Sequence, residues 1–244
     1  MVTLRNITSD RQFVFDILHL TDDTEEVLAR VGTDAHQTAI RRLCDSLWLA
    51  GPERGLPWHV SSQLMVLMGK IEGKYWRPSP DIMVHPTGGS EPRSSWDVAV
   101  EGVPPFVVEV ASPATWEDDL TIKRRTYGYV GVQEYLVVDP TTDLLGMSVQ
   151  AWHATEEGFV PWPAGADGRW RSAVLPVSLQ PEGLLLRVYD EMGAPVPIIG
   201  EQARRIAEQT RRAEEQVRIV EEQVRHITEL EAELRRLRGE AEGS

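Results

Sequence analysis

The feature that most constrains the fold is a pair of apolar runs separated by a stretch of helical periodicity. Phe106–Ser112 (FVVEVAS) and Glu134–Pro140 (EYLVVDP) are almost continuously apolar, as expected of strands covered on both faces. The segment Asp118–Val130 between them repeats apolar residues at helical spacing. A strand–helix–strand unit returns its second strand parallel to the first, so we expect an α/β sheet with a parallel pair across residues 106–138.

The rest of the body supplies one more helix and several strands. Residues 34–50 place Leu43 and Leu47 on one face of an amphipathic helix, with Asp34 as its expected cap. Further strand-like segments lie at Trp58–Met68, Asp81–Val84, Gly146–Ala154, Gly158–Trp162 and Ser172–Leu179. This order predicts a mixed sheet flanked by helices.

The chain divides into a body and a tail. We expect the body over residues 34–190 and a Pro-containing linker over 191–202, whereas residues 1–33 show no pattern that assigns them. Over residues 203–238 a seam of alternating four- and three-residue steps predicts a coiled coil: Ile206, Thr210, Ala213, Val217, Val220, Val224 and Ile227, continued after a stammer by Leu230, Leu234 and Leu237. β-branched residues at alternate seam positions favour two strands. A solvated single helix is the alternative, but it would leave the stripe in water, so we expect self-association.

Composition limits the class of protein. The net charge is −13, of which residues 201–244 carry −2 and residues 1–200 carry −11, so the body lacks the basic surface of a simple nucleic-acid binder. Cys44 is the only cysteine, which excludes an intramolecular disulfide, and we expect it to be an inert core residue. No signal peptide and no apolar run of about 20 residues is present, so we expect a cytoplasmic location and no membrane span.

Glu109 is anomalous because it interrupts the most apolar strand. A buried carboxylate is costly unless it meets a cation, a metal or strong donors. The alternatives are a place at an exposed strand end or an ion pair with an arginine. Asp81 opens the strand Asp81–Val84 after Pro80, where an acid also serves as an ordinary turn residue.

Lys123 lies on the apolar face of the helix that follows the Glu109 strand. Leu120, Lys123, Tyr127 and Val130 step by three, four and three residues. An inward lysine needs an anionic partner, and Glu109 is the natural one; a lysine that snorkels at the edge of the stripe is the alternative. Two carboxylates from neighbouring strands and one lysine suit a Mg²⁺ or Mn²⁺ site in which the metal activates water against a phosphate.

Three stretches carry a resemblance to a known family: PDIMV (Pro80–Val84), GVPPFVVEVASPAT (Gly102–Thr115) and DDLTIKRRTYGYVGVQEYLVVDP (Asp118–Pro140). Together they resemble the Uma-type restriction endonucleases of the PD-(D/E)XK nuclease superfamily. The resemblance implies a restriction-endonuclease-like fold with Asp81 and Glu109 as metal ligands and Asp81, Glu109 and Lys123 as the catalytic set. The superfamily lysine usually stands two residues after the second acid, where this chain has Ala111.

Five further polar residues recur in the pattern. We expect Asp119 to interact with the helix dipole, and Glu134 and Asp139 to organise the two ends of the last strand. His36 and Gln63 are either supporting groups of the site or ordinary surface and core-edge residues.

These features predict a metal-dependent endonuclease acting on DNA, with the tail as the element of self-association. The alternative is a catalytically weak nuclease-fold protein that acts as an oligomeric interaction module. Action on RNA is not distinguished from action on DNA by the sequence.

Overall fold

The computed structural model describes residues 33–71, 74–183 and 185–242. The N-terminal segment without an assignable pattern therefore lies almost wholly outside the described residues. The described chain forms two compact units, one ending at Pro197 and one beginning at Ile198.

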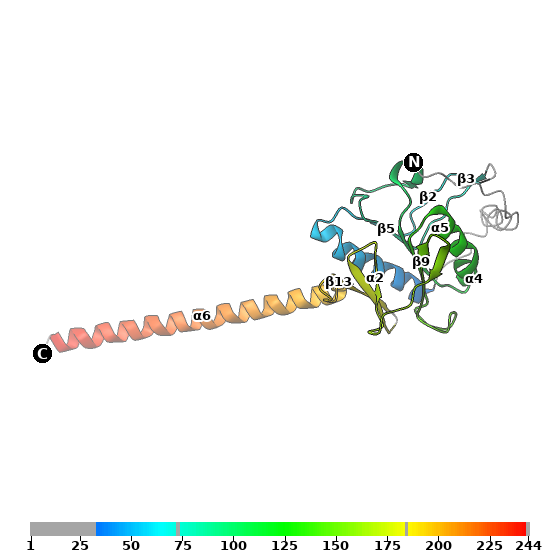
Figure 1. Ribbon diagram of the computed structural model, residues 1–244. Coiled ribbons are helices and arrows are strands. Elements are labelled where there is room, and N and C mark those ends of the chain that lie inside the picture. Colours follow the sequence, from blue (N-terminus) through cyan, green and yellow to red (C-terminus); the bar gives the residue numbers. More distant parts are fainter. Residues whose placement is uncertain (1–32, 72–73, 184, 243–244) are drawn as a thin grey trace. The chain divides into compact units, whose positions relative to one another are not determined.

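A six-stranded mixed sheet is the centre of the first unit (Figure 1). Its strands lie in the order β1 (His59–Ser61), β5 (Ile82–His85), β7 (Phe106–Val110), β8 (Glu134–Val138), β9 (Val149–Thr155) and β10 (Gly158–Pro161). Strands β7 and β8 are parallel, which confirms the expected pair, and every other neighbouring pair in this sheet is antiparallel. The chain thus has the mixed α/β sheet that the sequence predicts.

The crossover between the parallel strands is not one continuous helix. It consists of α4 (Trp116–Asp118), a π-helical turn η3 (Asp119–Lys123) and α5 (Arg124–Val130). π-helical turns are rare and often occur at functional sites, because the wider turn changes which side chains share a face. Gly131, with φ of 102°, ends α5 in the left-handed conformation.

Helix α2 (Asp34–Ala50) covers one face of the sheet. Its cap is Thr33, whose hydroxyl accepts a hydrogen bond from the His36 N–H at 3.3 Å, so the expectation that Asp34 caps the helix is wrong. Asp34 instead stands in the first turn, where its charge suits the helix dipole. Gly51 ends the helix beside the Trp58 ring, and a Cβ atom there would come within 2.1 Å of that ring.

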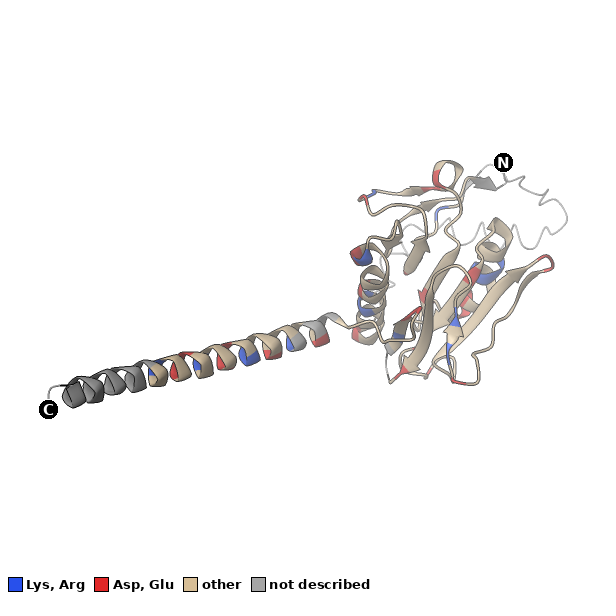
Figure 2. Ribbon diagram, turned by 60° about the vertical axis from the view of Figure 1, so that its left-hand side comes forward, with Lys and Arg blue, Asp and Glu red and all other residues tan. Residues whose placement is uncertain are grey.

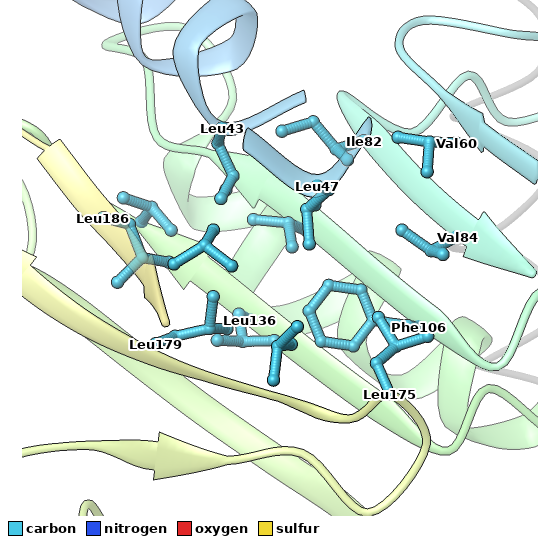
Figure 3. Packing of buried hydrophobic residues seen from close by; sticks show 14 of the residues in the cluster. Leu43, Leu47, Val60, Ile82, Val84, Phe106, Leu136, Leu175, Leu179 and Leu186 are labelled. Carbon is cyan, nitrogen blue, oxygen red and sulfur yellow. The ribbon is translucent and has the colours of Figure 1, made fainter. Parts of the chain in front are cut away.

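The core has two layers, one on each face of the sheet. Between α2 and the sheet lie Leu43, Leu47, Phe106 and Leu136 (Figure 3). The other face holds a second cluster that contains Trp76, Trp96, Tyr127 and Tyr135. Residues of β7 and the residue that follows it alternate between these layers: Val108 and Val110 belong to the first, Val107 and Ala111 to the second. Glu109 therefore faces the layer beneath η3 and α5.

Smaller elements complete the first unit. They are η2 (Pro52–Arg54), the parallel pair β2 (Val66–Leu67) and β6 (Trp96–Asp97), the hairpin β3 (Lys70–Ile71) and β4 (Lys74–Tyr75), α3 (Val98–Glu101), and the sheet β11 (Trp170–Arg171), β12 (Val177–Glu182) and β13 (Leu185–Asp190). The expected strand over residues 58–68 is interrupted between β1 and β2. Cys44 packs at the edge of the first core layer, and burial raises the pKa of its thiol to about 11, as suits an inert residue.

The second unit is the helix α6 (Ile199–Glu242), of 44 residues. It begins inside the segment expected to be a linker, because after Pro197 only Gly200 weakens an otherwise helix-favouring sequence. The self-association expected of this helix stays a prediction. Among the described residues, no helix is both long and apolar enough to span a bilayer.

Candidate active site

Glu109 is buried at the centre of β7 with 1% of its surface exposed. Its Oε1 accepts a hydrogen bond from the Tyr127 hydroxyl at 2.8 Å, and its Oε2 accepts one from the Asp81 N–H at 3.3 Å. The alternative of an exposed strand end is therefore wrong. The Tyr127 hydroxyl and the Asp81 N–H therefore hold the Glu109 carboxyl group inside the second core layer.

Asp81 stands immediately before β5 and beside Glu109. In the antiparallel register Ile82 pairs with Val108, so the next pair outward brings Asp81 opposite Glu109. The contacts are reciprocal: Asp81 donates its N–H to Glu109, and Asp81 Oδ2 accepts the Val110 N–H at 2.8 Å. Asp81 thus contacts the neighbouring strand rather than only its own turn.

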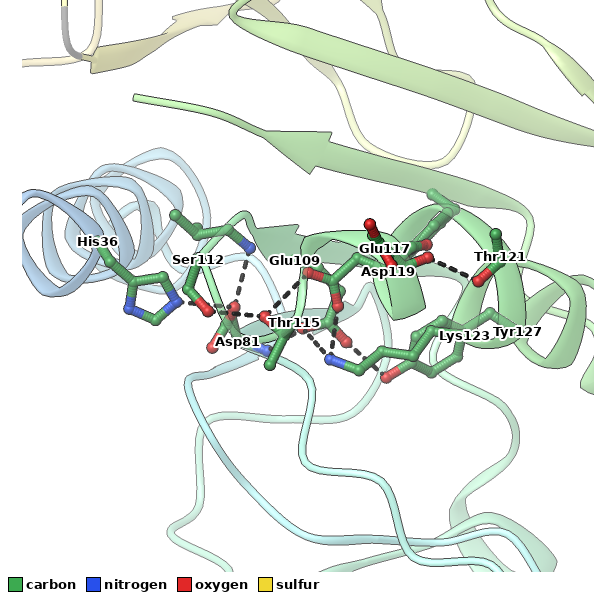
Figure 4. A network of polar contacts seen from close by, with 12 residues as sticks. His36, Asp81, Glu109, Ser112, Thr115, Glu117, Asp119, Thr121, Lys123 and Tyr127 are labelled. Atoms are coloured by element: carbon green, nitrogen blue, oxygen red, sulfur yellow. Dashed lines mark hydrogen bonds and ion pairs between the residues drawn. The ribbon is translucent and has the colours of Figure 1, made fainter. Parts of the chain in front are cut away.

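Lys123 extends from η3 toward the carboxyl groups of Glu109 and Asp119 (Figure 4). Its Nζ lies 3.2 Å from Glu109 Oε2 and 2.7 Å from Asp119 Oδ1, while 22% of its side chain is exposed. The lysine therefore points inward to an anionic partner and does not snorkel away from it. Asp81, Glu109 and Lys123, which come from three different elements, converge on one place.

Asp119 also belongs to this cluster, although the sequence predicted only an interaction with the helix dipole. It is fully buried, its Oδ2 accepts from the Thr115 hydroxyl at 3.3 Å, and its carbonyl accepts from the Tyr135 hydroxyl at 2.8 Å. Its side chain pairs with Lys123 instead of acting only through the helix dipole. The signal in the sequence was the spacing of four residues between an acid and a base.

His36 and Gln63 differ in their relation to Asp81. His36, which is buried on α2, places Nε2 3.5 Å from Asp81 Oδ2, so it supports the site from the opposite core layer. Gln63 has an exposed side chain and contacts the region through its backbone, whose N–H lies near the carbonyl oxygens of Pro80 and Asp81. With φ of 52°, Gln63 adopts a left-handed conformation that is uncommon outside glycine.

The acids in this cluster have unequal proton affinities. Burial raises the pKa of Glu109 to about 8, and the charges of Asp81 and Asp119 act in the same direction, against the opposing effect of Lys123. Burial likewise raises the pKa of Asp119. For Asp81, burial is outweighed by the hydrogen bond from His36 and the charge of Lys123, so its pKa lies below the usual value. One carboxylate is thus ionised at neutral pH while its neighbour resists ionisation.

The lysine is held in its charged form. Burial lowers the pKa of Lys123, but the nearby carboxyl groups of Glu109, Asp119 and Asp81 outweigh that effect, and the pKa lies well above its usual value. An ammonium group at neutral pH donates hydrogen bonds and attracts negative charge, but it cannot accept a proton.

Glu134 and Asp139 lie outside this cluster, as expected. Glu134 accepts from the Ser172 hydroxyl at 2.5 Å and the Ala173 N–H at 2.6 Å, which ties the start of β8 to a distant loop. Asp139 accepts the N–H groups of Leu144 and Leu145 at 2.8 and 2.9 Å, which shapes the turn after β8. Both residues organise the ends of the strand, which confirms the structural role predicted for them.

The donor set limits how a metal could be held. Within the described residues, no group of three or more His, Cys, Asp and Glu side chains is placed to hold an ion. Asp81 and Glu109 offer hard oxygen atoms from adjacent strands. Mg²⁺ is commonly held by one or two carboxylates together with waters and substrate phosphates, so these two residues fit such an ion.

Comparisons with known proteins identify the family of the chain. Residues 18–150 match the family model for Uma2, described as "Putative restriction endonuclease". No curated protein matches the chain significantly. A crystal structure of "a putative nuclease belonging to DUF820" from Anabaena variabilis ATCC 29413 is similar with a TM-score of 0.41 and 14% identity, over 55% of this chain and 70% of that chain. Because the family match spans more than half of the sequence and contains Asp81, Glu109 and Lys123, the chain belongs to the Uma2 family.

Proposed function

We propose that this protein is a divalent-metal-dependent endonuclease that hydrolyses phosphodiester bonds in DNA. The observation that carries the proposal is the convergence of Asp81, Glu109 and Lys123, with Lys123 Nζ 3.2 Å from Glu109 Oε2 and Glu109 bonded to the Asp81 N–H. A carboxyl group with a strongly raised pKa beside a second acid and a lysine is typical of a functional site.

Asp81 and Glu109 are the residues that would hold Mg²⁺ or Mn²⁺. A bound divalent cation supplies Lewis acidity, which makes coordinated water more acidic and offsets charge on the phosphate. The Tyr127 hydroxyl and the Asp81 N–H fix the two oxygens of Glu109, and the Val110 N–H and His36 orient Asp81. These four contacts keep the carboxyl groups in place before any ligand arrives.

Lys123 has an electrostatic role in this proposal. The oxygen of a water molecule attacks phosphorus, the bond from phosphorus to the leaving sugar oxygen breaks, and the proton lost by the water is balanced by protonation of the leaving oxygen. Negative charge gathers on the phosphoryl oxygens during this step, and the Lys123 ammonium group stabilises it. Asp119 positions Lys123 for this purpose through the ion pair at 2.7 Å.

The acidic body sets a condition on the substrate. A net charge of −11 over residues 1–200 repels a polyanion, so we propose that divalent cations also screen the approach of DNA. The same charge favours a second candidate function, in which the fold acts as an oligomeric interaction module without catalysis.

The deciding experiment combines metal binding with cleavage. Calorimetry with Mg²⁺ on the wild type, Asp81→Ala and Asp81→Asn should show binding in the wild type alone. The asparagine variant controls for misfolding, because its amide oxygen can still accept the hydrogen bond from the Val110 N–H. Glu53→Ala, which removes an exposed acid of the same body, is the control and should behave as the wild type.

Cleavage is measured on plasmid DNA and on single-stranded RNA. Binding unchanged by both Asp81 variants would overturn the proposed metal site. Metal binding without cleavage of either polymer would favour the interaction module. Cleavage of RNA alone would show that the substrate is RNA and not DNA.

We also propose that α6 joins copies of this chain. Its apolar side chains are strongly exposed in a single chain, with 57% of Ile206, 57% of Val217 and 55% of Ile227 accessible to solvent. Such a stripe becomes stable when it is buried against another helix.

A further inference from the structure

A seven-residue repeat runs through the first four heptads of α6. Residues 201–228 contain Glu-Gln-x-Arg at the start of every heptad, beginning at Glu201, Glu208, Glu215 and Glu222. A strict repeat of seven, rather than the 3.6-residue period of a free helix, is the spacing of a seam that contacts another helix.

Two of the glutamates that open these repeats pair with arginines of the same helix. Arg212 lies 2.5 Å from Glu208, and Arg218 lies 2.7 Å from Glu215. Figure 2 shows Lys and Arg alternating with Asp and Glu along the described part of α6. These charges therefore lie on the outer face of the repeat and are matched without a partner chain.

The third and sixth residues of each repeat form the seam. They are Ala203 and Ile206, Thr210 and Ala213, Val217 and Val220, and Val224 and Ile227. Each of the five larger side chains among them is between 55% and 57% exposed. β-branched residues occupy both seam positions. This combination favours a coiled coil of three or more helices, whereas β-branched residues at only one of the two positions would favour two helices.

The residues that flank the seam determine the direction of pairing. Glutamine precedes the third position in every repeat, at Gln202, Gln209, Gln216 and Gln223, and the seventh position holds Ala207, Glu214, Glu221 and Thr228. In parallel helices each flanking glutamine meets the seventh residue of the same repeat in the second copy, which gives Gln209 with Glu214 and Gln216 with Glu221 of the second copy. In antiparallel helices glutamine meets glutamine, and glutamate meets glutamate.

We infer that α6 forms a parallel, in-register coiled coil with further copies of this chain. The parallel arrangement replaces the repulsion between glutamates by hydrogen bonds from glutamine amides to carboxylates. It joins every body to the same end of the coiled coil. The inference rests on the self-association proposed above and is independent of the nuclease chemistry.

Disulfide trapping tests the direction in the full-length chain. In antiparallel helices a sixth position of the repeat packs against a third position of the other copy, so the test combines Ile206→Cys, a sixth position, with Val224→Cys, a third position. Both are made in a Cys44→Ser background and oxidised separately and as a mixture. They are 18 residues apart, about 27 Å along a helix, which is far beyond the reach of a disulfide. A parallel pair gives disulfides between identical positions and no mixed product. Ile219→Cys, on the outer face, is the control and should cross-link poorly.

A charge substitution gives an independent test, because it should change the strength of self-association in opposite directions for parallel and antiparallel helices. Gln216→Lys would face Glu221 in parallel helices and should tighten self-association about two- to five-fold. In antiparallel helices the new lysines would face each other and weaken it. Ile219→Lys adds the same charge on the outer face and is the matched control.

The outcomes separate the two proposals. Mixed disulfides, or weaker association of Gln216→Lys than of its control, would overturn the parallel direction alone. A wild-type chain that sediments as a monomer and forms no cross-links would overturn self-association itself. Neither outcome bears on metal binding by Asp81 and Glu109.

Discussion

Lys123 and Asp119 stand four residues apart, and the Nζ of the lysine lies 2.7 Å from Oδ1 of the aspartate. The same ammonium group lies 3.2 Å from Oε2 of Glu109, so it joins the π-helical turn η3 to the central strand β7. Asp119 is fully buried, and this ion pair places a positive charge against its carboxyl group. The ion pair with Asp119 fixes the end of the long, flexible Lys123 side chain, whereas a lysine without such a partner would be free to move.

Asp119→Asn should separate metal binding from catalysis. The substitution releases Lys123 from one partner, and misplacement of a catalytic group by about 1 Å lowers the rate about 100-fold. Mg²⁺ affinity should be unchanged or tighter, because the charge of Asp119 raises the pKa of Glu109. Single-turnover cleavage and calorimetry measure the two effects.

Glu117→Gln is the control for this variant, since Glu117 is an exposed acid on the neighbouring α4. Equal losses of metal affinity and rate in Asp119→Asn would show that Asp119 serves the metal site or the fold rather than Lys123.

Glu109→Gln should remove a pH dependence of stability. The pKa of Glu109 is raised from 4.5 to about 8 in the folded protein, so between these values the folded state holds a proton that the unfolded state has lost. Its contribution to stability is therefore fully present below about 4.5 and is lost as pH rises through about 8. Melting temperatures in EDTA at pH 5, 6.5 and 8 should show the variant gaining on the wild type as pH rises.

Mg²⁺ adds a second readout to this comparison. Binding to the folded state alone stabilises it, so Mg²⁺ should raise the melting temperature of the wild type at pH 8 and leave Glu109→Gln unaffected. A variant that melts well below the wild type at every pH would identify Glu109 as a structural residue.

The sequence predicts the parts of this fold that depend on the spacing of apolar residues close together in the chain. The parallel pair of β7 and β8 was predicted because two apolar runs flank a helical segment. The inward position of Lys123 was predicted because the residues around it step at helical spacing. Both depend on residues close together in the chain, where periodicity is informative.

The remainder depends on tertiary contacts or on local geometry without a clear signal. The sequence predicts that Asp81 and Glu109 share one site, but it does not predict their hydrogen bonds, which follow from the register of β5 on β7 and join segments 28 residues apart. The π-helical turn that contains Asp119 and Lys123 has no marker in residue propensities. The four-residue spacing of these two residues is visible in the sequence, but the complete burial of Asp119 is not, so Asp119 was assigned to the helix dipole. The strand β13 shows no alternation of buried and exposed residues that the sequence could reveal, because four consecutive residues, Leu186 to Tyr189, are all buried.

Tyr127→Phe should weaken metal binding without disrupting the fold. Tyr127 is fully buried, and its hydroxyl donates to Glu109 Oε1 at 2.8 Å, a bond that favours the ionised carboxylate. Its loss costs about 1–3 kcal/mol of stability, because a buried acceptor loses its donor. Since the bond lowers the pKa of Glu109, the variant should need a higher pH for half-maximal Mg²⁺ binding. An unchanged pH profile would show that the hydroxyl does not act on Glu109.

Val220→Asp and Ile219→Asp test the seam of α6 with two neighbouring residues. In a single chain their exposures are similar, 55% for Val220 and 46% for Ile219, so an isolated helix should tolerate both substitutions equally. The heptad repeat places only Val220 in the seam, where a buried side chain of this size contributes about 1.5–3 kcal/mol. Sedimentation equilibrium should therefore show the dissociation constant raised about ten-fold or more by Val220→Asp and nearly unchanged by Ile219→Asp. Circular dichroism at high protein concentration verifies that both helices form, since aspartate lowers helix propensity equally at either position. If both variants associate as the wild type does, the contact between copies lies on the body, and the exposed stripe of α6 is not the surface that joins them.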